Sequence, residues 1–180
     1  MTLAARLAYG ETLGDRVMKV DHAGEHGAIC IYRAQRWMAR WTAPDLVAEI
    51  DGFLLHERRH RMIFGAELAR RGRSRCRSFL ACGLGGFVLG AVTGLLGRQA
   101  IAATTLAIEA VVLRHMHAQI AALDGIDPQA VAALRDVIAE EQAHHDASEL
   151  RLGHATIWSA IIDPIVGIST ESVIWLGMRL

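Results

Sequence analysis

Carboxylate and imidazole side chains recur in this chain at a spacing that suits metal binding. The pattern Glu-x-x-His occurs at residues 57–60 and, 84 residues later, at residues 141–144. Residues three apart share one face of a helix, so each pair directs a carboxylate oxygen and an imidazole nitrogen to the same point. A single Glu precedes each pair by 32 residues, which completes two copies of one pattern: Glu25, Glu57 and His60, then Glu109, Glu141 and His144.

Six such side chains on four helices are a known arrangement for two metal ions. In ferritin-like carboxylate proteins, two helices each supply one Glu and two others each supply a Glu-x-x-His pair, and together they hold two iron or manganese ions. Any one of these residues taken alone is more often a surface Glu or a hydrogen-bonded core His. Four elements at matched intervals are harder to attribute to chance, so the spacing predicts a two-metal site.

The residues around these candidate ligands predict that most of the site is buried. Glu109 stands among apolar neighbours at helical spacing, including Leu106, Val112 and Met116. The two Glu-x-x-His pairs also have largely apolar neighbours, whereas the face around Glu25 is more polar. An unpaired carboxylate in an apolar core is strongly destabilising. These side chains therefore need partners, which metal ions would provide.

The first copy of the pattern also fits a zinc site. His56-Glu57-Arg58-Arg59-His60 matches H-E-x-x-H, in which two His bind zinc and the Glu is the general base of a hydrolase. In that interpretation His56 is a ligand and Glu57 is free, whereas in a two-metal carboxylate site Glu57 is a ligand and His56 is spare. The zinc pattern has only three fixed positions and leaves four residues unexplained, so the two-metal site is favoured: Glu25, Glu109, Glu141 and His144.

Length and composition favour a single all-α domain spanning residues 1–180. The chain is 52% apolar and only 6% aromatic, and its runs of Ala and Leu favour helices over strands. Nineteen Lys and Arg residues balance nineteen Asp and Glu residues, which argues against a nucleic-acid partner. The three cysteines form no Cys-x-x-Cys pair and are expected to be reduced. Charges interrupt residues 1–16, so we expect no secretory signal.

Proline and glycine mark the ends of the expected helices. The first helix should stop before Pro44, the second at Gly72 and the third at Gly125. Asp127 followed by Pro128 provides an N-cap and a proline in the first turn of the fourth helix. A last apolar helix is expected to start near Pro164. The four earlier helices are predicted over residues 12–41, 45–71, 99–124 and 128–152.

An uncharged, glycine-rich segment separates the second and third expected helices. Residues 79–97 carry no charge, and their length just reaches the roughly 20 residues needed to cross a bilayer. Six glycines weaken this segment as an isolated helix. Gly86, Gly90 and Gly94 would let another backbone or a flat apolar ligand approach closely. We expect a buried or interfacial helix; a membrane span and a mobile segment that gates substrate are the alternatives.

Basic residues gather just before this segment. Residues 58–77 contain eight Arg and one acidic residue, Glu67. Such a cluster is usually a solvated face. Beside an apolar run it could instead meet anionic lipid, and the sequence leaves both possibilities open.

Residues around the candidate ligands resemble a known family. Residues 21–28, D-H-A-G-E-H-G-A, closely resemble the D-H-A-G-E-Y-G-A signature of the demethoxyubiquinone hydroxylases, the di-iron monooxygenases of ubiquinone biosynthesis. Residues 140–146, E-E-Q-A-H-H-D, resemble the E-E-x-E-H-H-D stretch of that family. Two positions depart from it: His26 replaces a Tyr, and Met116 replaces a Tyr that often follows the retained His115. These departures bear on any relay through tyrosine and leave the six ligands in place.

The resemblance implies a fold, a reaction and a role for each candidate. It implies a ferritin-like four-helix bundle in which O2 and two iron ions convert 5-demethoxyubiquinol to 5-hydroxyubiquinol. His115 becomes a candidate for proton or electron transfer between substrate and metal, or else a hydrogen-bonded core His. Asp21 and Asp146 are candidates to hold the ligand histidines from outside. The implied ligands are Glu25 and His60 on one iron, Glu109 and His144 on the other, with Glu57 and Glu141 bridging.

A polyprenyl benzoquinol substrate implies a membrane surface. The lipid tail stays in the bilayer, so we expect the protein to dock peripherally on the cytoplasmic face of the inner or cell membrane through residues 58–97. A homo-oligomer or a lipid-binding accessory protein remains open. The main alternative function is a ferritin-like or rubrerythrin-like iron oxidase or iron-storage protein, which would use the same ligands. The apolar segment argues against a soluble cage.

Overall fold

Helices make up all the regular structure of the residues described in the computed structural model, which are 4–153 and 157–180. The chain therefore has the all-α class that its composition predicts. The four long helices expected from the sequence begin and end within two residues of the predicted positions. The elements are α1 (Leu13–Thr42), the 3-10 turn η1 (Pro44–Leu46), α2 (Val47–Arg70), α3 (Phe79–Leu96), α4 (Arg98–Leu123), α5 (Pro128–Leu152) and α6 (Ile157–Gly177).

Side-chain caps fix the starts of α1 and α5. The hydroxyl of Thr12 accepts a hydrogen bond from the backbone N–H of Asp15, and the Asp15 carboxylate accepts one from the N–H of Thr12. This reciprocal pair satisfies two N–H groups that lack helical partners. Asp127 accepts from the N–H of Ala130 at 3.1 Å, with Pro128 in the first turn, which confirms the predicted cap.

The start of α6 is where the sequence-based prediction is wrong. The helix begins at Ile157, seven residues before the predicted start, and Pro164 lies inside it. Proline favours the first turn of a helix, because an N–H in that turn has no helical partner and its loss costs nothing there. Inside a helix it leaves one carbonyl, that of Ala160, without its usual donor. Ala160 and Pro164 are both exposed, so water can bond that carbonyl.

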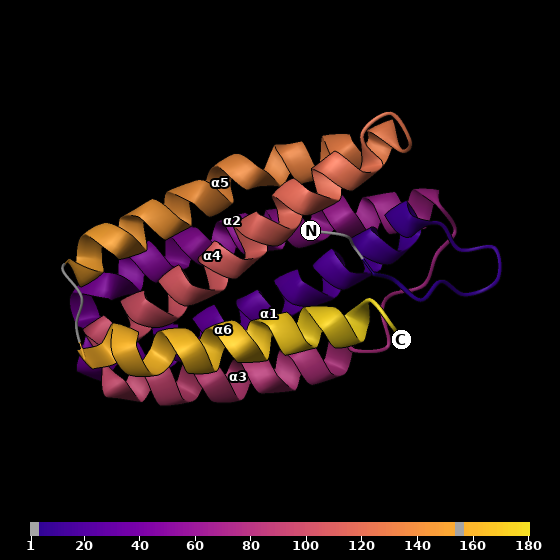
Figure 1. The fold of residues 1–180 in the computed structure, drawn as a ribbon. Coiled ribbons are helices and arrows are strands. Elements are labelled where there is room, and N and C mark those ends of the chain that lie inside the picture. The colour runs from indigo at the N-terminus through magenta and orange to yellow at the C-terminus, as the bar shows by residue number, and fades with distance from the viewer. Residues whose placement is uncertain (1–3, 154–156) are drawn as a thin grey trace.

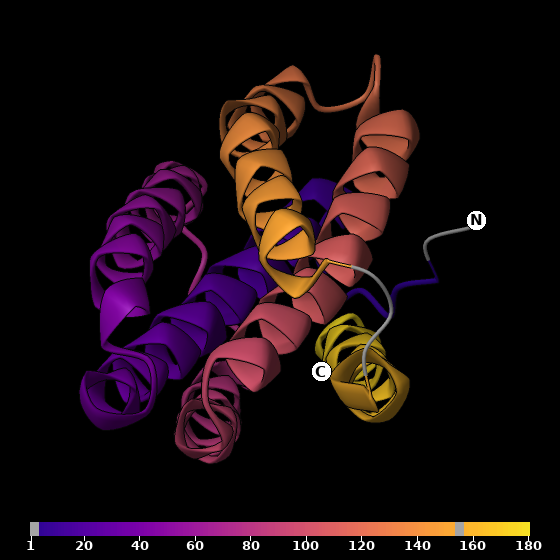
Figure 2. The same ribbon diagram turned by 90° about the vertical axis from the view of Figure 1, so that its left-hand side faces the viewer.

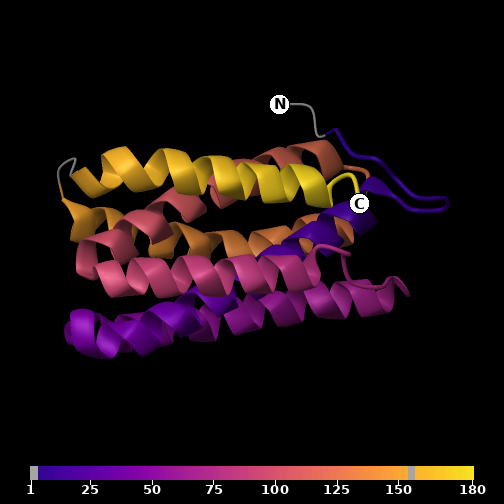
Figure 3. The same ribbon diagram turned by 90° about the horizontal axis from the view of Figure 1, so that it is seen from below.

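Four helices form the bundle that the spacing of the acidic residues predicts, and two cover one side of it. Figure 1 shows α5 along one side of the molecule and α3 and α6 along the other, and Figure 2 shows the same order from one end. Seen from below in Figure 3, α3 and α6 both run along this side of the bundle, with parts of α4 and α5 visible between them. α3 packs chiefly on α1, and α6 packs on α4. The bundle itself is made by α1, α2, α4 and α5.

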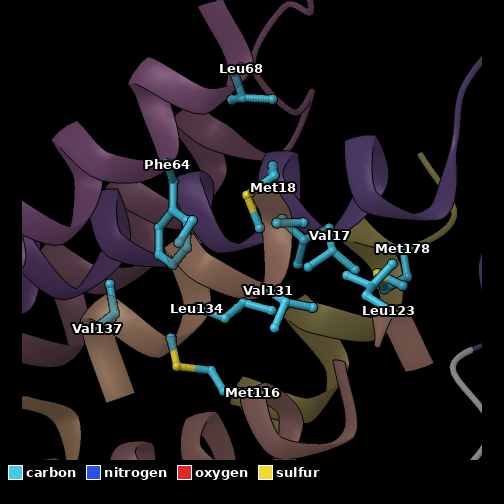
Figure 4. Close-up of a cluster of buried hydrophobic side chains, with 13 residues drawn as sticks. Val17, Met18, Phe64, Leu68, Met116, Leu123, Val131, Leu134, Val137 and Met178 are labelled. Carbon is cyan, nitrogen blue, oxygen red and sulfur yellow. The ribbon is translucent and has the colours of Figure 1, made fainter. Parts of the chain in front are cut away.

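Apolar side chains fill the bundle on both sides of the acidic residues. One cluster joins Met18 of α1, Phe64 of α2, Met116 of α4 and Leu134 of α5, all almost fully buried (Figure 4). Burial of each such side chain contributes about 1.5–3 kcal/mol. A second cluster, around Tyr32, lies in the C-terminal half of α1 and the N-terminal part of α2. The candidate ligands fall between these clusters in sequence on both helices, so the core encloses them along the bundle axis.

The glycine-rich segment is a helix that touches α1 backbone to backbone. A Cβ added at Gly86 would lie 2.3 Å from the carbonyl oxygen of Gly27, and one added at Gly90 would lie 2.2 Å from that of Ile31. Only glycine permits this distance, which confirms that the glycines admit another backbone. The opposite face of α3 is apolar and exposed; it carries Leu80, Leu84, Phe87, Val88, Val92, Leu95 and Leu96.

Part of the basic stretch turns inward. Arg71 is 10% exposed and donates to both carboxylate oxygens of Asp127, at 2.7 and 2.8 Å. Arg71 and Arg73 also pair with Asp15, so the end of α2 is tied to the starts of α1 and α5. These arginines are structural, whereas Arg77 is exposed. The basic stretch is thus only partly a solvated face.

Candidate metal centre

The fold brings all six candidate ligands together. Glu25 comes from α1, Glu109 from α4, and one Glu-x-x-His pair each from α2 and α5. Each helix presents its ligand on the face that packs against the other three, because its apolar neighbours must be buried there. None of the six residues is more than 5% exposed.

The six residues form two groups of four that share two members. Glu25, Glu57, His60 and Glu141 each place one ligand atom within 4.8 Å of the others, and Glu57, Glu109, Glu141 and His144 do the same. Glu57 and Glu141 belong to both groups, and each group has one histidine. We call the first group the His60 position and the second the His144 position. His56 belongs to neither group, so the geometry gives no support to the zinc pattern.

Both histidines turn the same ring nitrogen inward. The Nδ1 of His60 lies 2.8 Å from a Glu141 oxygen and 3.8 Å from a Glu25 oxygen. The Nδ1 of His144 lies 3.3 Å from a Glu57 oxygen and 3.7 Å from a Glu109 oxygen. Each Nδ1 therefore faces a cluster of carboxylates, as a metal-binding nitrogen must.

The donor set fits two divalent cations. The four carboxylates are buried, and in the described part of the chain their ion pairs are with histidine, not with Lys or Arg. Glu57 Oε1, His60 Nδ1 and His144 Nδ1 are buried atoms without a partner of proper hydrogen-bond geometry. Buried charges and orphaned polar atoms are costly unless something neutralises them. Two metal ions would do both, and a set of carboxylates with imidazole suits iron or manganese.

Charges inside the cluster shift the pKa values of its members. Burial, together with repulsion from Glu57 and Glu141, raises the pKa of Glu25 well above its usual value. Burial and the nearby Glu141 do the same to the pKa of Glu109. Burial alone would lower the pKa of His144, but the nearby carboxylates of Glu109, Glu141 and Glu57 raise it to about 12. Protons thus hold the cluster together without metal, and metal binding must displace them.

The outer ring nitrogen of each ligand histidine contacts a side chain on the helix of the other ligand histidine. The Nε2 of His60 on α2 lies 2.7 Å from a carboxylate oxygen of Glu140 on α5. The Nε2 of His144 on α5 lies 3.0 Å from Nδ1 of His56 on α2. Glu140 and His56 each directly precede the ligand Glu of their own helix. This regularity in the sequence could have identified them as the outer partners. Such outer partners orient the ligand ring and set its tautomer.

The two residues suggested from the sequence for this role lie elsewhere. Asp21 is partly buried and accepts a hydrogen bond from Gln119 at 3.0 Å. Asp146 is exposed on α5 and bonds to Gln142 and His145 on its own helix. The suggestion of Asp21 and Asp146 was therefore wrong, because helical spacing cannot show which residue of a neighbouring helix meets a ring.

A tyrosine that sequence reasoning passed over lies at the centre. Tyr32 is 2% exposed, and its hydroxyl donates to a Glu109 oxygen at 2.9 Å. Its ring packs against Phe53 and meets the ring of His144 edge-on. Tyr32 follows Glu25 by seven residues, two helical turns, so its place on the same face could have been read from the sequence.

The remaining residues singled out in the sequence belong to neither ligand group. His115 is 5% exposed, and its Nε2 lies 2.7 Å from a carboxylate oxygen of Glu171 on α6. A groove of about 500 Å³ between α4 and α6 is lined by Arg114 and Glu171. His26 stacks on Phe79 of α3, with ring centroids 3.9 Å apart. Met116 lies in the apolar core, so neither departure from the family signature removes a group from the metal centre.

The fold and the site define a ferritin-like helical bundle with a carboxylate-rich centre suited to two metals. A family model described as "Ubiquinone biosynthesis protein COQ7" matches residues 12–177. The chain belongs to this family. Its resemblance to the demethoxyubiquinone hydroxylases is therefore confirmed across nearly the whole sequence.

Relatives from distant organisms agree with this assignment. The chain is 32% identical to the mouse (Mus musculus) "NADPH-dependent 3-demethoxyubiquinone 3-hydroxylase, mitochondrial" over 92% of the chain and 77% of that protein. It is 36% identical to the Rhodospirillum rubrum "3-demethoxyubiquinol 3-hydroxylase" over 92% of the chain and 78% of that protein. It is 35% identical to the Saccharomyces cerevisiae "5-demethoxyubiquinone hydroxylase, mitochondrial" over 59% of the chain and 46% of that protein.

Proposed function

We propose that this chain is a monooxygenase of ubiquinone biosynthesis that hydroxylates the ring of a polyprenyl benzoquinol, taking 5-demethoxyubiquinol to 5-hydroxyubiquinol with O2. Family membership and the names of the relatives support the reaction. The observation that carries the proposal is the pair of overlapping four-residue groups that share Glu57 and Glu141. A reaction that places one oxygen atom on a ring and reduces the other to water needs a centre able to bind and reduce O2, and two adjacent iron ions would be one.

Each ligand has a definite place in this proposal. Glu25 and His60 would be terminal ligands of one iron, Glu109 and His144 of the other, and Glu57 with Glu141 would bridge the two. Bound iron would supply the electrons and the coordination positions at which O2 is reduced. The protein contributes hard carboxylate ligands, only one imidazole per metal, and apolar layers that keep bulk water out.

We also propose that His115 transfers a proton or an electron between the substrate and the metals. It lies on α4, the helix that supplies Glu109, and it is almost fully buried. Its Nδ1 is buried without a hydrogen-bond partner, while Glu171 engages Nε2. An imidazole held on one side and unpartnered on the other can pass a proton without moving.

We propose that the protein docks peripherally on the cytoplasmic face of the inner or cell membrane, and its apolar outer surface is compatible with docking on a membrane. In the described part of the chain, three helical segments are long and apolar enough to cross a bilayer by length and composition: Phe79–Leu96, Arg98–Leu123 and Ala160–Gly177. The second carries Glu109 into the centre of the bundle, so we place it inside the protein. The first and third run along the same side of the bundle, and each carries exposed apolar residues (Figure 1). A polyprenyl tail could be collected from the bilayer there.

Two measurements test the proposed function. The gene for this chain is expressed in a strain that lacks the demethoxyubiquinol hydroxylase, and quinone intermediates are read by mass spectrometry. The proposal requires loss of the demethoxy intermediate and return of ubiquinone. The purified protein should hold two iron ions and form hydroxylated quinol with a reductant and O2. Iron oxidation without any quinol product would instead support the iron-oxidase alternative, and so would uptake of many irons per chain.

A further inference from the structure

The outer partners of the two histidines differ in charge. Glu140, next to His60, is a carboxylate that also pairs with Arg59 on α2 at 3.0 Å. His56, next to His144, is an imidazole whose Nδ1 faces the His144 ring. The rings of His56 and His144 are stacked, 8° from parallel. The two halves of the centre thus share one ligand pattern but not the same surroundings.

Because of the direction of these hydrogen bonds, the difference in charge between Glu140 and His56 changes how strongly each ligand histidine donates to its metal. A histidine that binds metal through Nδ1 carries its proton on Nε2 and donates it to the outer partner. Glu140 would accept that proton as an anion. His56 can accept it only through the lone pair on Nδ1, and therefore only as a neutral ring. A carboxylate partner makes the ligand imidazole more basic, and a neutral partner does so much less.

The terminal carboxylates, Glu25 and Glu109, also differ in donor strength, and again the weaker donor belongs to the His144 position. Glu109 accepts the hydroxyl of Tyr32 on Oε1, the oxygen that also faces His144. A hydrogen bond to a carboxylate oxygen draws charge from it and weakens it as a donor to metal. Among the described residues, Glu25 receives no hydrogen bond from a protein donor. Both terminal ligands of the His144 position are therefore the weaker donors of their kind.

We infer that the two metal positions are unequal: the His60 position fills first and holds its metal more tightly than the His144 position. The ligands Glu57 and Glu141 contribute to both positions, so we assign the difference to the ligands that are not shared and to their outer partners. Glu140 and His56 act as positioning residues, since they reach the metals only through His60 and His144. The inference rests on the proposed metal centre and adds an order of filling.

Cobalt(II) titration of the metal-free protein tests this inference without relying on activity. Visible absorption follows each binding step, and elemental analysis after desalting counts the bound metal. We expect two steps, with dissociation constants that differ by about tenfold or more. Glu140→Gln keeps an acceptor for His60 but removes the charge. It should weaken binding at the His60 position by about 10–100-fold, so that the two steps merge or exchange order, while the affinity of the His144 position stays nearly unchanged.

Changes at His56 provide the reciprocal arm. His56→Glu gives His144 a charged partner and should strengthen the second step by about tenfold. His56→Gln retains a neutral acceptor, serves as the matched control, and should leave both steps near those of the unchanged protein. Circular dichroism establishes that each variant is folded. If either Glu140→Gln or His56→Glu does not fold, the result for the other variant is sufficient to decide.

The possible outcomes separate this inference from the function on which it rests. Two bound metals with equal affinities would overturn the order of filling and leave the two-metal centre intact. Weakening of both steps alike by Glu140→Gln, or no strengthening by His56→Glu, would also overturn it. A protein that binds no metal would remove the proposed centre itself.

Discussion

The contact between α3 and α1 gives a sharp test of the fold, because two glycines of one helix differ in what surrounds them. A Cβ at Gly90 would lie 2.2 Å from the Ile31 carbonyl oxygen and 2.8 Å from the Ile31 Cα. A Cβ at Gly85 would meet nothing within 4 Å. Ordinary contact starts at 3.4 Å, so Gly90→Ala must push the two backbones apart by about 1 Å. Neither backbone can yield as a flexible side chain would.

The expected difference between the two variants follows from this geometry. Alanine gains about 1 kcal/mol over glycine as a helix former at both positions, so that gain cancels in the comparison. The remaining cost of overpacking at Gly90 is about 1–3 kcal/mol. For a chain of this size each kcal/mol moves the midpoint of thermal unfolding by about 2–4 °C. Gly90→Ala should therefore unfold about 2–12 °C below Gly85→Ala.

Thermal unfolding followed by far-UV circular dichroism, in the same buffer for both variants, measures this difference. Gly85→Ala should unfold at or slightly above the temperature of the unchanged protein. Equal midpoints for the two variants would refute the backbone contact, and the packing of α3 on α1 described above would have to be abandoned. Cobalt(II) binding by Gly90→Ala adds a second readout, since α1 also carries Glu25.

Three further predictions address charge, pH and the surface. Metal-free protein should lose stability as pH rises from 6.5 towards 12. The pKa of His144 is raised from 6.5 to about 12 in the folded state, so the charged imidazolium stabilises the fold fully below pH 6.5 and no longer does so above about pH 12. Metal-loaded protein, with a neutral His144, should lack this dependence, and denaturation midpoints with and without metal compare the two; matching curves would contradict the assignment. Arg71→Ala should lower the free energy of unfolding by about 1.5–3 kcal/mol, because Asp127 and Asp15 lose a largely buried partner, while exposed Arg77→Ala should change it by about 0.5 kcal/mol or less, as urea unfolding would measure. Phe87→Glu with Leu96→Glu should reduce co-sedimentation with anionic vesicles. Ile126→Glu with Leu150→Glu, at residues that are more exposed and lie just before or on α5, should not; undiminished binding of the first pair would exclude docking through α3.

Local signals were enough to predict the helices. Thr12 and Asp127 supply side-chain acceptors at the starts of α1 and α5, and Gly72 and Gly125 take left-handed conformations after α2 and α4. These effects act within one helical turn, so they can be read from a short stretch of sequence. Pro164 misled for the same reason: its local preference for a first turn was overridden because α6 is exposed there and tolerates a missing N–H.

The direction in which each basic residue points depended on the assembled fold. Eight Arg in residues 58–77 suggested one surface feature. Arg71 and Arg73 instead reach carboxylates at the starts of α1 and α5. In sequence, Arg71 lies 56 residues and Arg73 lies 58 residues from their shared partner Asp15. No periodicity in the stretch itself distinguishes them from exposed Arg77. Their partners become neighbours only when three helix ends meet.

The sequence by itself determined which residues gather at the centre. Three-residue and 32-residue spacings put Glu25, Glu57, His60, Glu109, Glu141 and His144 on inward helix faces, since the helical repeat is fixed by backbone geometry. Tertiary structure alone decided what surrounds them. Glu140 meets His60, His56 meets His144 and Tyr32 meets Glu109 across helix interfaces, where rotation and offset are set by side-chain packing of both partners. Identical ligand patterns therefore came with unequal neighbours, which the doubled sequence motif could not reveal.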